Sequence, residues 1–370
     1  MKDVLISGAG VAGPALAYWL HHHGFVPTVV ERTAVPRPGG QAIDVRGVAL
    51  DVVERMGLLT EIRDAATNMR GMSFVDADGV ELMRSTEETL TGGLIDSPDV
   101  EVMRDDLCEI FLRHTRNDVE YVYGDSITAL VESPAGVSVT FDSGLSRTFD
   151  LVVGADGLHS NVRALVFGEE SQFLHHMGIY LSIFSTPNHL DLDHWQVFHR
   201  TPGRMSGVYS ARRNTEARAM LGFESALLDF DHRDLDQQRE LVADVFAGGG
   251  WETPRLLKAM WEAPDFYFDS MSQVRMERWW RGRTALVGDA GFCGSPLSGQ
   301  STSAALVGAY VLAGELMAAS GDHLIAFPAY QSRIHAYVTR NQDLAAANAE
   351  ERPTPEVVAA AANALELPTY

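Results

Sequence analysis

The stretch that decides the fold reads VLISGAGVAG, residues 4–13. Its apolar start predicts a short buried strand, and Gly8, Gly10 and Gly13 follow at the spacing of a phosphate-binding turn. In such a turn the first glycine permits the bend and the second lets the backbone approach a pyrophosphate. The third lets the next helix pack on the strand. The pattern predicts a dinucleotide site without separating FAD from NAD, and a glycine turn with no ligand is the alternative.

The residues after this turn complete a strand–helix–strand unit. A helix is expected from about residue 14 to 23, followed by a strand over 26–31. The amino end of this helix would offer free N–H groups to phosphate. Glu31 ends the second strand, where an acid meets a ribose hydroxyl in such units. We therefore assign Val11 and Ala12 of the turn, Glu31, and the adjacent Arg32 to the same cofactor site.

Two further glycine motifs follow apolar strands. Asp156-Gly157 comes after residues 151–153, and Gly288-Asp289 comes after residues 284–287. An aspartate at such a strand end can accept a hydrogen bond from a sugar or ribityl hydroxyl. Taken singly, the first could be an Asp-Gly turn with Ser160 capping a helix, and the second a simple strand-terminal turn.

The coarse pattern predicts an α/β protein with a Rossmann-like domain, an inserted domain built on a sheet, and a C-terminal helix. Alternating apolar residues predict a hairpin at 71–85, a β-rich run over 119–154 and aromatic-rich strands between 180 and 223. The expected nucleotide-binding domain comprises residues 1–70, 99–169 and 276–350. The expected substrate domain comprises residues 71–98 and 170–275, and residues 351–370 form the tail and its helix.

Composition excludes several classes of partner. The 370 residues carry 50 acidic and 29 basic side chains, a formal charge of −21, which repels nucleic acid and anionic membranes. No apolar run is expected to approach membrane-spanning length. Cys108 and Cys293 suggest no disulfide framework, so a reducing cytoplasm is expected. No metal site is expected, because the consecutive residues His21, His22 and His23 point about 100° apart on a helix.

The three motifs in this order resemble those of the FAD-dependent aromatic hydroxylases, the class A flavoprotein monooxygenases with the para-hydroxybenzoate hydroxylase fold. The likeness covers residues 3 to 345 and is strongest to tetracycline-modifying and actinomycete polyketide-tailoring members. This resemblance implies which residues would hold FAD. They are Gly8, Gly10, Gly13, Glu31, Arg46, Arg104, Asp156, Gly157, Asp289, Pro296, Gly299 and Gln300.

The resemblance also gives these residues places along the cofactor. Arg104 would contact phosphate or flavin, and Arg46 would lie in the segment beside the flavin, with a solvated surface arginine as its alternative. The loop from Pro296 to Ser301 would edge the isoalloxazine, with the next helix pointing its positive end at the reduced ring. Two residues depart from the family pattern: Ser301 replaces the usual second glycine of Gly-Gln-Gly, and Phe292 replaces a common histidine.

Aromatic residues on the strands of the inserted domain are candidates for a substrate pocket, with ordinary core packing as the alternative for each. They are Phe184, Trp195, Phe198, Tyr209 and Phe223. No catalytic residue is assigned.

The resemblance implies an NAD(P)H- and O2-dependent hydroxylase acting through a C4a-hydroperoxyflavin on an aromatic or enolic small molecule, with polyketides and antibiotics as candidates. No separate nicotinamide domain is visible, so NADPH or NADH would dock transiently. A flavin-dependent reductase, dehydrogenase or redox-neutral cyclase on the same scaffold is the alternative. A scaffold that only sequesters a ligand is a third. The assembly would be a monomer or homodimer.

Overall fold

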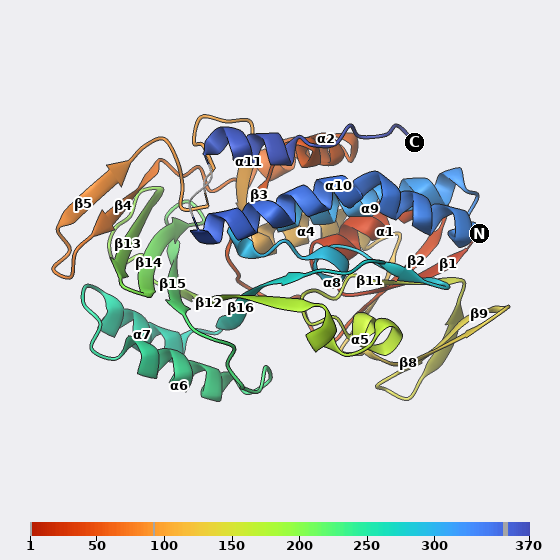
Figure 1. The fold of residues 1–370 in the computed structure, drawn as a ribbon, viewed down its shortest axis with the longest axis horizontal. Helices are drawn as coiled ribbons and strands as arrows, with labels where there is room; N and C mark the ends of the chain where they lie inside the picture. The colour runs from red at the N-terminus through yellow and green to blue at the C-terminus, as the bar shows by residue number, and fades with distance from the viewer. Residues whose placement is uncertain (1, 92, 351–353) are drawn as a thin grey trace.

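The computed structural model describes residues 2–91, 93–350 and 354–370. The start of the predicted tail, from 351 to 353 and including Pro353, lies outside the described residues. The fold is a mixed α/β arrangement with a largely parallel sheet, a long second sheet and a helical cover, as predicted (Figure 1).

The part of the molecule that contains the glycine turn is built on a six-stranded sheet. Five strands are parallel and β17 pairs antiparallel to β18. In spatial order the strands are β17 (Trp280–Arg281), β18 (Thr284–Leu286), β11 (Leu151–Gly154), β1 (Asp3–Ser7), β2 (Val26–Glu31) and β7 (Glu120–Tyr123). The predicted glycine turn therefore leaves the central region of a parallel sheet.

Both faces of this sheet are covered, as the apolar strands require. Val4 and Ile6 of β1 pack in the core with the helices α1 (Ala12–His22), α9 (Ser301–Ala318) and α10 (His323–Glu350). Leu5 points to the other face. There it meets α5 (Asn161–Phe167) and a three-stranded sheet of β8 (Ile127–Ser133), β9 (Gly136–Phe141) and β10 (Ser146–Phe149).

One predicted strand, 147–154, is two strands in different sheets. Residues up to Phe149 pair antiparallel with β9, whereas those from Leu151 pair parallel with β1. The chain changes partner at Asp150, whose backbone N–H donates to the Asp3 carbonyl at 2.9 Å. The only mark of this change in the sequence is Asp150, a charged residue between the apolar residues Phe149 and Leu151.

The second sheet has seven strands. All neighbours are antiparallel except β13 and β4, which run parallel. In order they are β16 (Tyr267–Val274), β12 (Leu174–Thr186), β15 (Glu216–Glu224), β14 (Arg204–Ala211), β13 (Trp195–Thr201), β4 (Gly71–Val75) and β5 (Glu81–Ser85). The predicted hairpin and aromatic strands thus share one sheet.

Two helices that the sequence pattern did not reveal cover one face of this sheet. α6 (Leu235–Phe246) and α7 (Thr253–Glu262) pack there, below the strands in Figure 1. Phe184 is fully buried between this face and the helices, with its ring 6.3 Å from that of Phe266. The opposite face carries Leu181, Ile183 and Met220 and looks toward the glycine turn.

The remaining elements close the molecule. A two-stranded antiparallel pair is formed by β3 (Ala42–Val45) and β6 (Val100–Met103), and α9 contacts β3, α1, α2 and α10. The helices not yet placed are α2 (Val48–Arg55), α3 (Leu59–Asp64), α4 (Arg104–Thr115), α8 (Asp289–Phe292) and α11 (Pro355–Ala362). The expected C-terminal helix is α11.

Helix α9 corrects one expectation. Its 18 residues are long and apolar enough to cross a membrane, although no such run was expected. However, 78% of this window is buried inside the protein. The core of a large α/β protein accounts for such a helix.

Phe184→Ala should lower the free energy of unfolding by about 3–5 kcal/mol, because it leaves a cavity between sheet and helices. Val80→Ala, at a side chain that is 60% exposed, is the matched control and should stay within about 0.5 kcal/mol. Urea unfolding followed by circular dichroism measures both. A loss below about 1 kcal/mol for Phe184→Ala would contradict the packing described.

Candidate active site

A single cavity of about 1150 Å³ runs from the glycine turn to the open face of the seven-stranded sheet. Its walls come from the carboxyl ends of β1, β2 and β11, the start of α4 and the loop before α9. Ligands bind at this end of parallel sheets because the loops diverge there and helix amino ends point inward. The cavity exceeds the roughly 300–1000 Å³ of a site for one small molecule.

The three glycines of the turn have different surroundings. A Cβ on Gly13 would lie 1.9 Å from the Gly8 carbonyl oxygen, and one on Gly8 would lie 2.5 Å from the Ala155 carbonyl oxygen. Gly8 also has a φ of +107°. A Cβ on Gly10 would meet nothing within 4 Å. Two glycines therefore serve close packing, while Gly10 faces open space in the cavity wall.

Glu31 fastens the turn. Its Oε2 accepts from the Ala9 N–H at 2.9 Å, and its Oε1 accepts from the Thr33 N–H at 3.0 Å. Val11, Ala12, Glu31 and Arg32 line the cavity, whereas Gly13 lies behind the turn. The ribose contact predicted for Glu31 remains a prediction.

Asp156 organises the second motif. Its Oδ2 accepts from the Val162 N–H at 3.0 Å and from the Ser7 hydroxyl at 3.3 Å, and burial raises the pKa of this carboxyl. Gly157 has a φ of +81°, and Ser160 caps α5 by accepting from the Arg163 N–H at 3.0 Å. The capped-turn interpretation is thus correct, and Asp156 and Gly157 also line the cavity.

The late motif forms a further part of the cavity wall, and a Cβ on Gly288 would lie 3.1 Å from the Cβ of Ala12 in the turn. Asp289 begins α8, and burial raises the pKa of its carboxyl. Pro296, Gly299, Gln300 and Ser301 line the cavity beside it. Among the described residues, Gln300 stands out because both atoms of its buried amide make no hydrogen bond.

The two residues that depart from the family pattern, Ser301 and Phe292, have different surroundings. Ser301 begins α9 and lines the cavity. Phe292 is 2% exposed and is absent from the cavity wall. Its ring packs 4.7 Å from that of Trp279. The residue at 292 therefore acts on the core behind the loop.

The two candidate arginines occupy distinct positions. Arg104 lines the cavity, and its Nη2 donates to the carbonyls of Gly39 at 2.8 Å and Arg37 at 2.9 Å. Arg46 is wholly buried, so the interpretation as a surface arginine is wrong. It pairs with Asp44 at 2.9 Å behind the wall and does not itself line the cavity.

The residues present fit FAD. An extended cavity joins three separated motifs, Gly10 leaves room for a close-approaching group, and α9 directs its amino end inward. The buried, unpartnered Gln300 amide would gain partners from a flavin ring edge, since buried polar groups are normally hydrogen-bonded.

Comparisons with known proteins agree. A family model described as "FAD binding domain" matches residues 1–352. A flavin-dependent monooxygenase from an unknown prokaryotic organism is 40% identical over 100% of this chain and 99% of its own. The chain belongs to the FAD-dependent monooxygenases. A Mycobacterium tuberculosis H37Rv protein, whose name assigns no function, is 56% identical over 94% of both chains.

Several solved structures superpose on this monooxygenase over most of its length. The crystal structure of tetracycline destructase Tet(51) superposes with a TM-score of 0.90 at 35% identity, covering 100% of both chains. Tetracycline destructase Tet(55) gives 0.88 at 38% identity, covering 100% of this chain and 99% of that one. CtdE in complex with FAD and a substrate shares the fold, with a TM-score of 0.74 at 19% identity.

Strand alternation decides which predicted aromatic residues reach the cavity. Phe198 and Tyr209 lie on the open face and line it. Phe184 and Trp195 lie on the helix-covered face and are absent from the cavity wall, which corrects their assignment. Phe223 reaches the cavity edge, but its ring stacks in the helix-side core.

Three polar residues of this wall were missed from the sequence. Gln196 lies between Trp195 and Phe198 on the open face, and Asp44 and Glu101 are opposite each other on β3 and β6. The signal was an acidic residue in the middle of each apolar strand, AIDV and VEVM. Burial and the neighbouring Asp44 carboxylate raise the pKa of Glu101 to about 7.

Gly10→Ala and Gly13→Ala should separate ligand binding from folding. At position 10 the methyl meets no protein atom but reduces the room for phosphate, so flavin affinity should fall while the melting temperature of flavin-free protein stays near wild type. At position 13 the methyl clashes with backbone, so the flavin-free protein itself should melt lower. Flavin content by visible absorption and differential scanning calorimetry measure the two effects. Equal behaviour of the variants would contradict these assignments.

Proposed function

We propose that this monooxygenase uses NADPH or NADH and O2 to hydroxylate an aromatic or enolic small molecule. One observation carries the proposal: the cavity that contains the three cofactor motifs continues onto an apolar sheet face carrying a few polar groups. Such a wall suits a planar, largely apolar ligand whose hydroxyl or carbonyl groups need orientation.

Bound FAD supplies the electron transfer from the nicotinamide and the activation of O2. The chain supplies the surroundings. Leu181, Ile183, Phe198 and Met220 form an apolar wall that excludes water from the reacting region. Gln196, whose Oε1 accepts from the Leu90 N–H at 3.0 Å, presents a fixed amide to the same space.

We assign the movement of a substrate proton to Glu101. Its Oε1 accepts from the Thr67 hydroxyl at 2.6 Å, which orients the carboxyl on the cavity wall. A pKa of about 7 lets the carboxylate accept a proton near neutral pH. We assign its second oxygen to the hydroxyl of a phenol or enol. Removing that proton makes the carbon framework more electron-rich and therefore easier to oxygenate.

The size of the cavity and the names of two similar solved structures support a proposal for the substrate class. About 1150 Å³ holds more than one ligand of ordinary size, which favours a cofactor together with a multi-ring substrate. Two similar structures are named tetracycline destructases. We therefore place polycyclic polyketides, including tetracycline-like antibiotics, first among candidates. The nicotinamide would dock transiently in the same groove.

The test of this function is a screen of polycyclic phenols and enols for compounds that accelerate NADPH or NADH oxidation. A true substrate should consume O2 and reductant in equal amounts and gain one ¹⁸O atom from ¹⁸O2 by mass spectrometry. Product formation without O2, or substrate-stimulated reductant consumption yielding only H2O2 from every compound, would contradict the proposal.

Glu101→Gln should change the pH dependence of turnover. In the wild type, kcat should rise as the pH passes about 7, because the carboxyl becomes a proton acceptor above its pKa. The amide cannot titrate, so the variant should be slower by roughly 10²–10⁴-fold and lack this limb. Stopped-flow and steady-state rates across pH measure it.

Stability gives an independent reading on the same variant. A carboxyl whose folded pKa is raised from 4.5 to about 7 destabilises the protein as the pH rises through this window. Glu101→Gln should remove that loss while retaining flavin. A variant with wild-type pH–rate and pH–stability profiles would contradict the role.

A further inference from the structure

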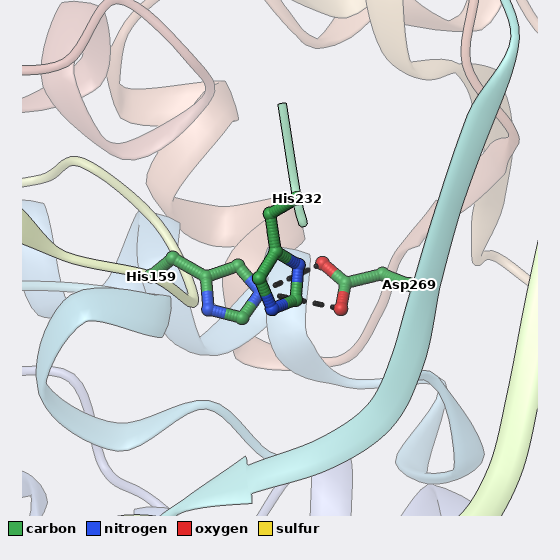
Figure 2. A group of neighbouring side chains, drawn as sticks. All are labelled: His159, His232 and Asp269. Carbon is green, nitrogen blue, oxygen red and sulfur yellow. Dashed lines mark hydrogen bonds and ion pairs between the residues drawn. The ribbon is translucent and has the colours of Figure 1, made fainter. Parts of the chain in front are cut away.

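Two histidines and an aspartate from distant segments face one another beside the cavity (Figure 2). His159 follows the Asp156-Gly157 motif, His232 precedes α6, and Asp269 lies on β16. One donor atom from each lies within 4.8 Å of the others. No motif spacing in the sequence connects these three residues, which explains why no metal site was expected.

The distances approach those of a metal centre. His159 Nε2 lies 3.0 Å from Asp269 Oδ2, and the two imidazole rings have centroids 4.3 Å apart. Tetrahedral Zn²⁺ holds its nitrogen and oxygen ligands at about 2.0–2.2 Å, which places neighbouring ligand atoms about 3.4 Å apart. The first pair is already near that separation. The His232 side chain is exposed to solvent, so its ring can rotate toward the other two ligands.

Neighbouring residues also hold the ligand side chains in fixed orientations. His159 Nδ1 donates to Glu170 Oε1 at 2.8 Å, which leaves Nε2 as the atom directed at Asp269. Glu170 is itself held by Arg163 at 2.7 Å. Asp269 is buried, and its Oδ1 accepts from the Ser270 N–H at 2.7 Å. Histidine ligands in zinc proteins characteristically donate their second N–H to a carboxylate in this way.

We propose that His159, His232 and Asp269 bind a divalent transition-metal ion of the zinc type, with water in the fourth position. Imidazole and carboxylate together suit Zn²⁺, whereas Mg²⁺ and Ca²⁺ favour oxygen ligands. Binding replaces the proton shared between His159 Nε2 and Asp269 with the ion, and that proton leaves to solvent. The ion ties the Asp156-Gly157 loop to β16 and to the start of α6.

This placement gives the ion a structural task. His159 lines the cavity two residues after Gly157, so a metal at Nε2 fixes the loop that carries one of the cofactor motifs. The site lies at the join between the parallel sheet and the seven-stranded sheet, whose relative position shapes the cavity. Its loading is therefore expected to raise thermal stability as well as to bind metal.

The experiment uses the FAD-loaded protein after treatment with a chelator. Isothermal titration with Zn²⁺ should show one site per chain. Co²⁺ should give tetrahedral absorption bands at wavelengths beyond those of flavin. His232→Ala should weaken Zn²⁺ binding by more than about 10-fold, and Glu170→Gln by roughly 10–100-fold. Zn²⁺ should raise the melting temperature of wild type and not of His232→Ala.

His22→Ala is the matched control, because it removes an exposed histidine from the run at residues 21–23. It should bind Zn²⁺ as wild type does. Loss of binding in this control, with retention in His232→Ala, would assign the metal to the helix surface and overturn the proposal. If the wild type binds neither Zn²⁺ nor Co²⁺, the three residues form a hydrogen-bonded cluster only and the proposal is overturned. Because His232 is exposed, its variant should fold, so either outcome is informative.

Discussion

The structure depends on how closely the backbone packs at the first glycine turn. The Gly8 carbonyl lies where a Cβ on Gly13 would be only 1.9 Å away, and Gly8 in turn is pressed against Ala155. The first approach lets α1 start directly over β1. The second brings the loop after β11 beside the turn, so Asp156 arrives at the same cavity. Two glycines thus set the geometry of the site through sterics, before any ligand is considered.

The seven-stranded sheet adds a second constraint, because each strand must serve a core and a cavity at once. Side chains alternate between the two faces, so Phe184 packs against helices while its neighbour Ile183 faces the cavity. A shift of one residue in register would exchange these roles along a strand. The apolar character of the cavity wall is therefore tied to the stability of the helix-covered face.

The sequence predicted the parallel sheet, the glycine turn and the order of the motifs, because short-range patterns encode them. It could not show which face of β12 or β13 is covered, since that depends on α6 and α7, which were not predicted. Trp195 and Phe184 were misassigned for this reason. Arg46 was assigned with a surface alternative because its partner Asp44 is meaningful only once β3 is placed against β6.

Several buried polar groups lie at or just behind the cavity wall. In the described part of the chain, Arg46 and Gln300 each have buried polar atoms without a hydrogen-bond partner. Gln300 belongs to the loop before α9, and the Arg46 side chain packs against Gly299 of the same loop. Such atoms cost free energy in the absence of a ligand. Next to Arg46, on the adjacent strands β3 and β6, burial and then the neighbouring Asp44 carboxylate raise the pKa of Glu101 to about 7. The Arg46–Asp44 ion pair therefore links the buried polar atoms that lack a partner to the pair of strands that carries the Glu101 carboxyl.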